Sequence, residues 1–211
     1  AETPDIYAHP ETLIQGGFAE SGERKAEAAG FTMNQAWKSR TFSELIAGMD
    51  LGDVDGDGKI ETVLAAEDKI MIYRYENQRF FEAGRIELPG YRVVVGVDAG
   101  DINGNGVDEI FVSALNSQRN RVQSMVYEHA NGSYAPIVES APWYFRVIRQ
   151  EDVGEQLYGQ RQKLGQDPFQ EPIYRMVWDG AEYASQNRVL PGEMANVLGF
   201  SMGRPTEAEK D

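Results

Sequence analysis

Two short acidic stretches of the chain carry the residue types that could do chemistry. Residues 51–65 read LGDVDGDGKIETVLA, and residues 99–113 read AGDINGNGVDEIFVS. In both stretches oxygen-bearing side chains alternate with other residues, glycines permit tight turns, and an apolar run follows at once. Calcium takes six to eight oxygen ligands, so this pattern indicates a cation-binding loop.

Each stretch places oxygen donors at positions 1, 3, 5, 7 and 9, counted from its first aspartate. The donors of the first loop are Asp53, Asp55, Asp57, the main-chain carbonyl of Lys59, and Glu61. The donors of the second loop are Asp101, Asn103, Asn105, the main-chain carbonyl of Val107, and Glu109. Water can complete both sets, so we predict two Ca²⁺ sites. The first loop has four carboxylates against two in the second, and we expect it to bind more tightly.

Other interpretations of the loops are possible. An EF-hand needs a bidentate glutamate at position 12 and flanking helices, but that position holds Leu64 and Val112, and both flanks are expected to be strands. Magnesium prefers a rigid octahedron that keeps several waters. Transition metals would recruit His or Cys, and neither histidine lies near a loop in the sequence. Ordinary acidic turns are the simplest alternative, because Asp, Asn and Gly favour turns, but two loops with the same donor spacing favour a metal.

Composition limits the partners of the chain. The formal net charge is −14, and no nucleic-acid partner is expected, because neutralising phosphates takes clustered Lys and Arg. The chain has no cysteine, which excludes disulfides, thiolate zinc sites and iron–sulfur clusters. No apolar run approaches the roughly 20 residues that cross a bilayer, so no membrane span is expected.

The elements that must position the loops recur about every fifty residues. Asp53 and Asp101 lie 48 residues apart, and the LPG sequences at Leu88 and Leu190 lie 102 residues apart. Hairpin sequences with an aromatic residue near each end follow in the same order, at 73–80, 126–134 and 176–183. The second and third contain Asn-Gly and Asp-Gly, which favour two-residue turns. Repeats of this length indicate solenoids or propellers.

Each unit contains four short strands and shows no long helical periodicity, so we predict an all-β fold. Four strands in about 45–50 residues match the size of a β-propeller blade. We expect blades at about 44–87, 92–138 and 143–190, and the start of another at 194–211, within a partial propeller over residues 36–211. Residues 1–35 fit no blade and are expected to form a connector or linker.

The motif D-x-D-G-D-G-x-x-E before an apolar strand, repeated about every fifty residues, resembles the FG-GAP or VCBS repeat. That repeat builds the calcium-binding β-propellers of integrin α-subunit heads and of many bacterial surface and secreted proteins. The resemblance covers residues 44–115 firmly and extends through the hairpins to about 200. Propellers of this family commonly carry about seven blades. The remaining blades are therefore expected from a longer chain or from another copy.

The resemblance implies a non-enzymatic calcium-binding propeller segment in a periplasmic, cell-surface or extracellular protein of a bacterium, which contacts another protein or a glycan. The alternative is an accessory propeller domain of a secreted enzyme, such as a polysaccharide lyase or lipase, whose catalytic domain lies outside this chain. No H-E-x-x-H motif and no phosphate-binding glycine loop occur in the sequence. We therefore expect this chain to have no catalytic activity of its own.

Overall fold

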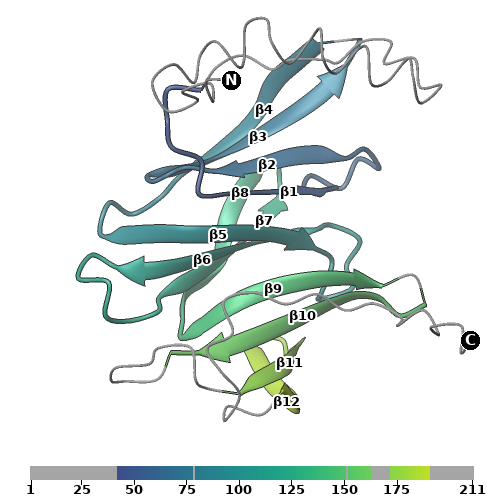
Figure 1. The fold of residues 1–211 in the computed structure, drawn as a ribbon. Coiled ribbons are helices and arrows are strands. Elements are labelled where there is room, and N and C mark those ends of the chain that lie inside the picture. Colours follow the sequence, from purple (N-terminus) through teal and green to yellow (C-terminus); the bar gives the residue numbers. More distant parts are fainter. Residues whose placement is uncertain (1–41, 78, 151, 163–171, 191–211) are drawn as a thin grey trace, which may run out of the picture. The chain divides into compact units, whose positions relative to one another are not determined.

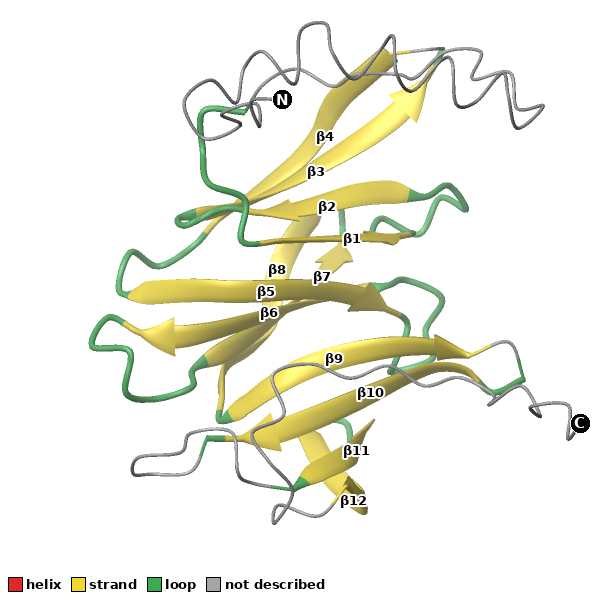
Figure 2. Ribbon diagram, viewed as in Figure 1, coloured by secondary structure: helices red, strands yellow, loops and turns green. Residues whose placement is uncertain are grey.

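A computed structural model describes residues 42–77, 79–150, 152–162 and 172–190 (Figure 1). Over these residues the chain consists of strands joined by loops (Figure 2). The strands form three antiparallel sheets of four strands each, in which every strand pairs with its neighbour in sequence. The all-β prediction with four-stranded units is therefore confirmed for the described residues. The expected connector at 1–35 and the expected fourth unit at 194–211 lie outside them.

The strands of each sheet follow one another along the chain. The first sheet contains β1 (Gly48–Gly52), β2 (Glu61–Ala65), β3 (Lys69–Glu76) and β4 (Arg79–Glu87). The second contains β5 (Arg92–Gly100), β6 (Glu109–Asn116), β7 (Ser124–Ala130) and β8 (Ser133–Ala141). The third contains β9 (Trp143–Gln150), β10 (Gly154–Arg161), β11 (Ile173–Trp178) and β12 (Tyr183–Leu190). In the described part of the chain, no helix is long and apolar enough to cross a membrane.

Tight turns set the order of the strands. The β7–β8 turn consists of Asn131 and Gly132, which have φ values of 53° and 82°. Positive φ at both central residues is the geometry of a two-residue hairpin, and Asn and Gly adopt it at the lowest cost. The third sheet departs from the other two at its first connection. There β9 and β10 pair directly from Gln150 to Gly154, so no nine-residue acidic loop separates them.

The second sheet is buried on both faces. In β6, Ile110 and Val112 pack into a cluster shared with the first sheet, whereas Phe111 packs into a cluster shared with the third. Successive side chains of a strand point to opposite faces, so the continuous apolar run of β6 serves two cores. The same alternation occurs in β7, where Met125 faces the first sheet and Val126 faces the third. A sheet with two buried faces needs a neighbour on each side.

Carboxylates join the sheets at their first strands. Asp50 in β1 accepts the main-chain N–H of Ala99 in β5 at 2.8 Å. Asp98 in β5 accepts the main-chain N–H of Val147 in β9 at 3.3 Å, and the two bonds span the same sequence distance of 49 residues. Each first strand pairs with only one strand of its own sheet, so the carboxylates satisfy amides that have no partner there.

Arg149 in β9 connects all three sheets. Its guanidinium contacts Asp50 in the first sheet at 3.2 Å and donates to the carbonyl of Ala99 in the second at 2.8 Å. It also pairs with Glu155 of its own sheet at 2.7 Å. A guanidinium offers five N–H donors in a planar fork, so one side chain can satisfy acceptors from several strands. Arg149 thus offsets negative charge where the first strands meet.

The close contact between β1 and β5 depends on a residue without a side chain. Gly48→Ala is expected to lower the free energy of unfolding by about 1–3 kcal/mol, because the added Cβ would lie 2.8 Å from the main-chain nitrogen of Val97. Gly96→Ala is the matched control, because nothing lies within 4 Å of the Cβ it would add. Urea unfolding of both variants measures the difference. Equal losses in the two variants would contradict the contact.

The buried carboxyl of Asp98 makes stability depend on pH. Burial raises its pKa to about 6, whereas the pKa of an aspartate in an unfolded chain is about 3.9. The folded state therefore holds the proton more tightly, and the stability linked to Asp98 is complete below about pH 4 and lost as the pH rises through about 6. Relative to the unchanged protein, Asp98→Asn should gain stability between pH 4.5 and 7.5 by about 2 kcal/mol.

Urea unfolding of both proteins at the two pH values measures this gain. All other titrating groups are shared by the two proteins, so the difference between them isolates Asp98. A difference that stays constant, or that moves in the opposite direction, would show that the folded pKa of Asp98 is not raised.

Candidate metal centre

The first acidic loop connects β1 to β2 and is shaped by its first carboxylate. Asp53 Oδ1 accepts the main-chain N–H groups of Gly56 at 2.9 Å and of Asp57 at 3.1 Å. Asp53 Oδ2 accepts the N–H of Gly58 at 2.8 Å. Gly56 and Gly58 have φ values of 74° and 83°, which residues with a side chain rarely adopt. The glycines and the aspartate together fold the loop around one carboxylate.

The second loop connects β5 to β6 and repeats this geometry. Asp101 Oδ1 accepts the N–H groups of Gly104 at 2.8 Å and of Asn105 at 3.0 Å, and its Oδ2 accepts that of Gly106 at 2.9 Å. Gly104 and Gly106 have φ values of 78° and 89°. The two loops therefore have the same main-chain geometry at matching positions.

The glutamate at position 9 closes each loop from the inside. Glu61 and Glu109 are both fully buried, and each accepts the N–H at position 2 of its own loop. Those donors are Val54, at 3.2 Å, and Ile102, at 2.8 Å. Burial raises the pKa of Glu61 and raises that of Glu109 to about 7. A buried carboxylate is costly without a cation or several donors beside it.

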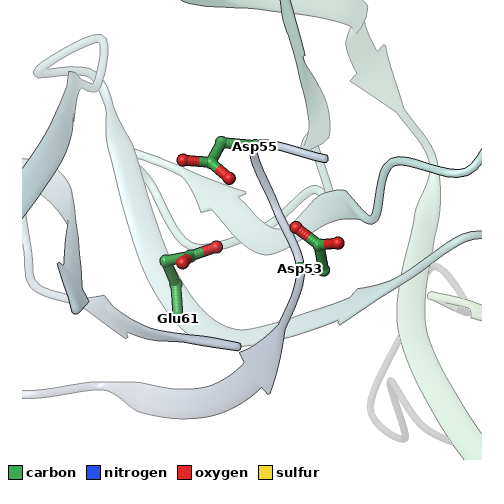
Figure 3. Close-up of side chains that lie close together, drawn as sticks. All are labelled: Asp53, Asp55 and Glu61. Carbon is green, nitrogen blue, oxygen red and sulfur yellow. The ribbon is translucent and has the colours of Figure 1, made fainter. Parts of the chain in front are cut away.

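Three carboxylates of the first loop converge. Asp53, Asp55 and Glu61 each place one oxygen within 4.8 Å of the other two (Figure 3). Two of these side chains come from the loop and the third from the start of β2. Carboxylate oxygens in such a group are the ligands that Ca²⁺ and Mg²⁺ prefer. The residue types at the site therefore fit a hard divalent cation.

Arg74 in β3 reaches the same oxygens. Its guanidinium lies 2.7 Å from Asp55 Oδ2, 2.8 Å from Asp57 Oδ2 and 2.7 Å from Glu61 Oε1. Antiparallel pairing places Arg74 directly opposite Glu61. The bond to Glu61 is the main reason that the pKa of Arg74 is raised above its ordinary value. The first loop thus has a cation of its own.

Glu128 in β7 lies beside the second loop. Its Oε2 accepts the side-chain amide N–H groups of Asn103 at 2.6 Å and of Asn105 at 2.8 Å. The amide oxygens of both asparagines accept main-chain N–H groups further along the loop. Glu128 thus adds a carboxylate beside Asp101 and Glu109, although within the described residues only Asp53, Asp55 and Glu61 bring three acidic oxygens within 4.8 Å of one another. The donor set of the second loop therefore also fits a hard cation.

A buried hydroxyl from the third sheet lies close to the second loop. Tyr183 in β12 is buried, and its hydroxyl makes no hydrogen bond of acceptable geometry. Burial, and then the charge of Glu109, raise the pKa of this hydroxyl. The tyrosine ring also packs against Phe111 and Phe145, so its position is fixed by the core. The hydroxyl therefore lies beside the buried carboxylate of Glu109, and the interaction between the two groups lowers the pKa of Glu109 while burial raises it.

The remaining predicted donors were the main-chain carbonyls of Lys59 and Val107, and their role as ligands stays a prediction. The side chain of Lys59 extends to Glu76, at 2.6 Å. Asp108, at position 8 of the second loop, accepts the N–H of Asp53 at 2.9 Å and donates its own N–H to the carbonyl of Asp53 at 3.0 Å. Asp108 therefore belongs to the contact between the two loops.

Arg74 and Glu128 are the site residues that the loop motif did not include. Both lie on the third strand of their sheets, opposite position 9 of the loop. A signal for them exists in the sequence, because Arg74 follows Tyr73 and Glu128 follows Tyr127 at matching places in the aromatic hairpin repeat. Aligning those hairpins would have placed residues of opposite charge beside two loops of the same shape.

Comparison with known families agrees with the loop geometry. The model of the FG-GAP-like repeat matches residues 53–112, a segment that contains both acidic loops and strands β2 to β5. No curated protein matches the chain. FG-GAP-like repeats suggest a β-propeller-like domain, in agreement with the four-stranded antiparallel sheets. The resemblance seen in the sequence is confirmed for this segment: residues 53–112 match the FG-GAP-like repeat.

Proposed function

We propose that this chain is a non-enzymatic, calcium-binding part of a β-propeller, in which the loops after β1 and β5 hold Ca²⁺. The observation that carries the proposal is one loop geometry used twice. In each loop an aspartate accepts hydrogen bonds from three main-chain N–H groups, and a buried glutamate closes the loop. Further oxygen-bearing side chains lie between the aspartate and the glutamate in the sequence. Bound Ca²⁺ would supply positive charge that neutralises the converging carboxylates and fixes the turn between a sheet's first two strands.

The donor chemistry favours calcium over other metals. The predicted donor side chains of the two loops offer only oxygen ligands, from carboxylates and amides. Transition metals prefer sites with nitrogen or sulfur ligands, and Mg²⁺ keeps several waters in a strict octahedron. Calcium accepts six to eight oxygens in flexible geometry, including main-chain carbonyls. A loop of nine residues with five oxygen donors suits it best.

The proposed setting is outside the cytoplasm, where the chain contacts another protein or a glycan. Extracellular calcium modules bind at roughly 10⁻⁴–10⁻³ M, a range suited to surroundings rich in calcium. The net charge of −14 supports solubility there. Large apolar side chains exposed on the first sheet, including Met49 and Leu51, support a contact with further blades of a longer chain or of another copy.

Calcium is expected to stabilise the protein. Ligand that binds only the folded state at 100 times its Kd adds about 2.7 kcal/mol, which raises the melting temperature by several degrees. Calorimetric titration with CaCl₂ and melting curves in CaCl₂, MgCl₂ and chelator measure the effect. Asp101→Asn should remove the contribution of the second loop, whereas Glu139→Asn, on exposed β8, should change nothing. The calcium proposal is wrong if no heat is released and chelator leaves the melting temperature unchanged.

A further inference from the structure

The two loops differ in the charge of one facing residue. Arg74 lies opposite Glu61 in the β2–β3 pairing. Glu128 occupies the matching place in the second sheet, one residue beyond the Ile110–Tyr127 pair and therefore opposite Glu109. The loop geometries match, but a cation faces the first loop and a carboxylate faces the second. The two facing residues lie on the third strand of each sheet, outside the loop motif, so the loop motif does not determine their charge.

Arg74 engages most of the carboxylates that a metal would need. It contacts Asp55, Asp57 and Glu61 within 2.8 Å, and its own side chain is only 14% exposed. A guanidinium stays charged at any ordinary pH and forms paired, directional hydrogen bonds with carboxylates. A divalent cation that enters this loop must therefore compete with Arg74 for the same oxygens.

Glu128 has the opposite effect on the second loop. No basic side chain is paired with Glu109, Asp101 or Glu128 among the ion pairs of the described residues. Among the described residues, the side-chain carboxylate of Glu128 accepts hydrogen bonds from the neutral amides of Asn103 and Asn105 and from no cation. It adds negative charge beside a buried glutamate without adding a cation. Entry of a divalent cation here displaces no positive charge.

We propose that Arg74 acts as a built-in cation of the first loop, and that Glu128 serves the second loop as a further carboxylate from outside the repeat motif. The first loop then keeps its shape without metal and binds Ca²⁺ weakly, whereas the second loop binds Ca²⁺ more tightly. This order is the reverse of the one expected from counting carboxylates within the loops. The inference rests on the proposed function, because it concerns how the two loops divide calcium binding between them.

The test measures each loop separately by calorimetric titration of the full chain with CaCl₂. Asp101→Asn weakens the second loop, so that the first loop dominates the signal, and Asp53→Asn does the converse. In the Asp101→Asn background, Arg74→Gln is expected to raise the calcium affinity at least about tenfold, since a unit charge a few ångströms away is removed. In the Asp53→Asn background, Glu128→Gln is expected to lower it about tenfold.

Matched controls carry the same charge changes elsewhere in the same sheets. Arg85→Gln alters an arginine of β4 that pairs with Glu82, and Glu139→Gln alters an exposed glutamate of β8. Both should leave calcium affinity within about twofold of the parent, because exposed charges outside the loops are screened. Arg74→Lys keeps the positive charge and should leave the first loop weak.

A second measurement addresses the built-in cation directly. In chelator, Arg74→Gln should melt several degrees below the unchanged protein, and CaCl₂ should restore most of the loss. A merely structural role for Arg74 predicts the loss without the rescue. Circular dichroism verifies that each variant folds. Should Arg74→Gln not fold with or without calcium, the Glu128→Gln titration decides the proposal by itself.

The outcomes separate this inference from the proposed function. If the unchanged chain, both single-loop backgrounds and Arg74→Gln all fail to bind calcium, the proposed function itself is wrong. If calcium binds but Arg74→Gln and Glu128→Gln leave the two affinities unchanged, only the division of roles is overturned. A first loop that binds more tightly than the second in the unchanged chain would overturn it as well.

Discussion

Carboxylates that accept main-chain N–H groups are the interaction on which the rest of this structure depends. Asp53 and Asp101 each gather three amides of their own loops, and Asp50 and Asp98 each take one from the next sheet. A buried amide that loses its acceptor costs about 1–3 kcal/mol. The same chemical group therefore shapes the loops and joins the sheets.

These partly buried carboxylates bring negative charges close together. Arginines that are remote in the sequence but in direct contact with the carboxylates offset part of this charge. Burial disfavours the charged forms of Asp98 and Glu109 and so raises their pKa values. Arg149 offsets the charge where the first strands meet, and Arg74 offsets it inside the first loop. Among the described residues no arginine pairs with the carboxylates of the second loop, and the proposed order of calcium affinities rests on that asymmetry.

The sequence was sufficient to predict the strands and both loops, because their signals are local. Alternating apolar residues, Asn131-Gly132, and the D-x-D-G-D-G motif each act within about ten residues. The partners of the loops could not be read in the same way. Arg74 meets Glu61 only through strand register, and Arg149 meets Asp50 across 99 residues of sequence. Such contacts depend on how whole sheets pack, and no periodicity within one strand encodes them.

The acidic loop of one sheet is hydrogen-bonded to the next sheet, close to the start of that sheet's second strand. Asp108, directly before β6, exchanges two hydrogen bonds with Asp53, and Glu155 in β10 accepts the N–H of Asp101 at 2.8 Å. Asp108 also lies between two predicted donors of the second loop, Val107 and Glu109, so the second loop directly contacts the first donor of the first loop. Each acidic loop is therefore held by hydrogen bonds to the following unit as well as by those within the loop. A single acidic loop without a following sheet would lack its outer acceptor, which is a physical reason for this motif to occur in consecutive copies.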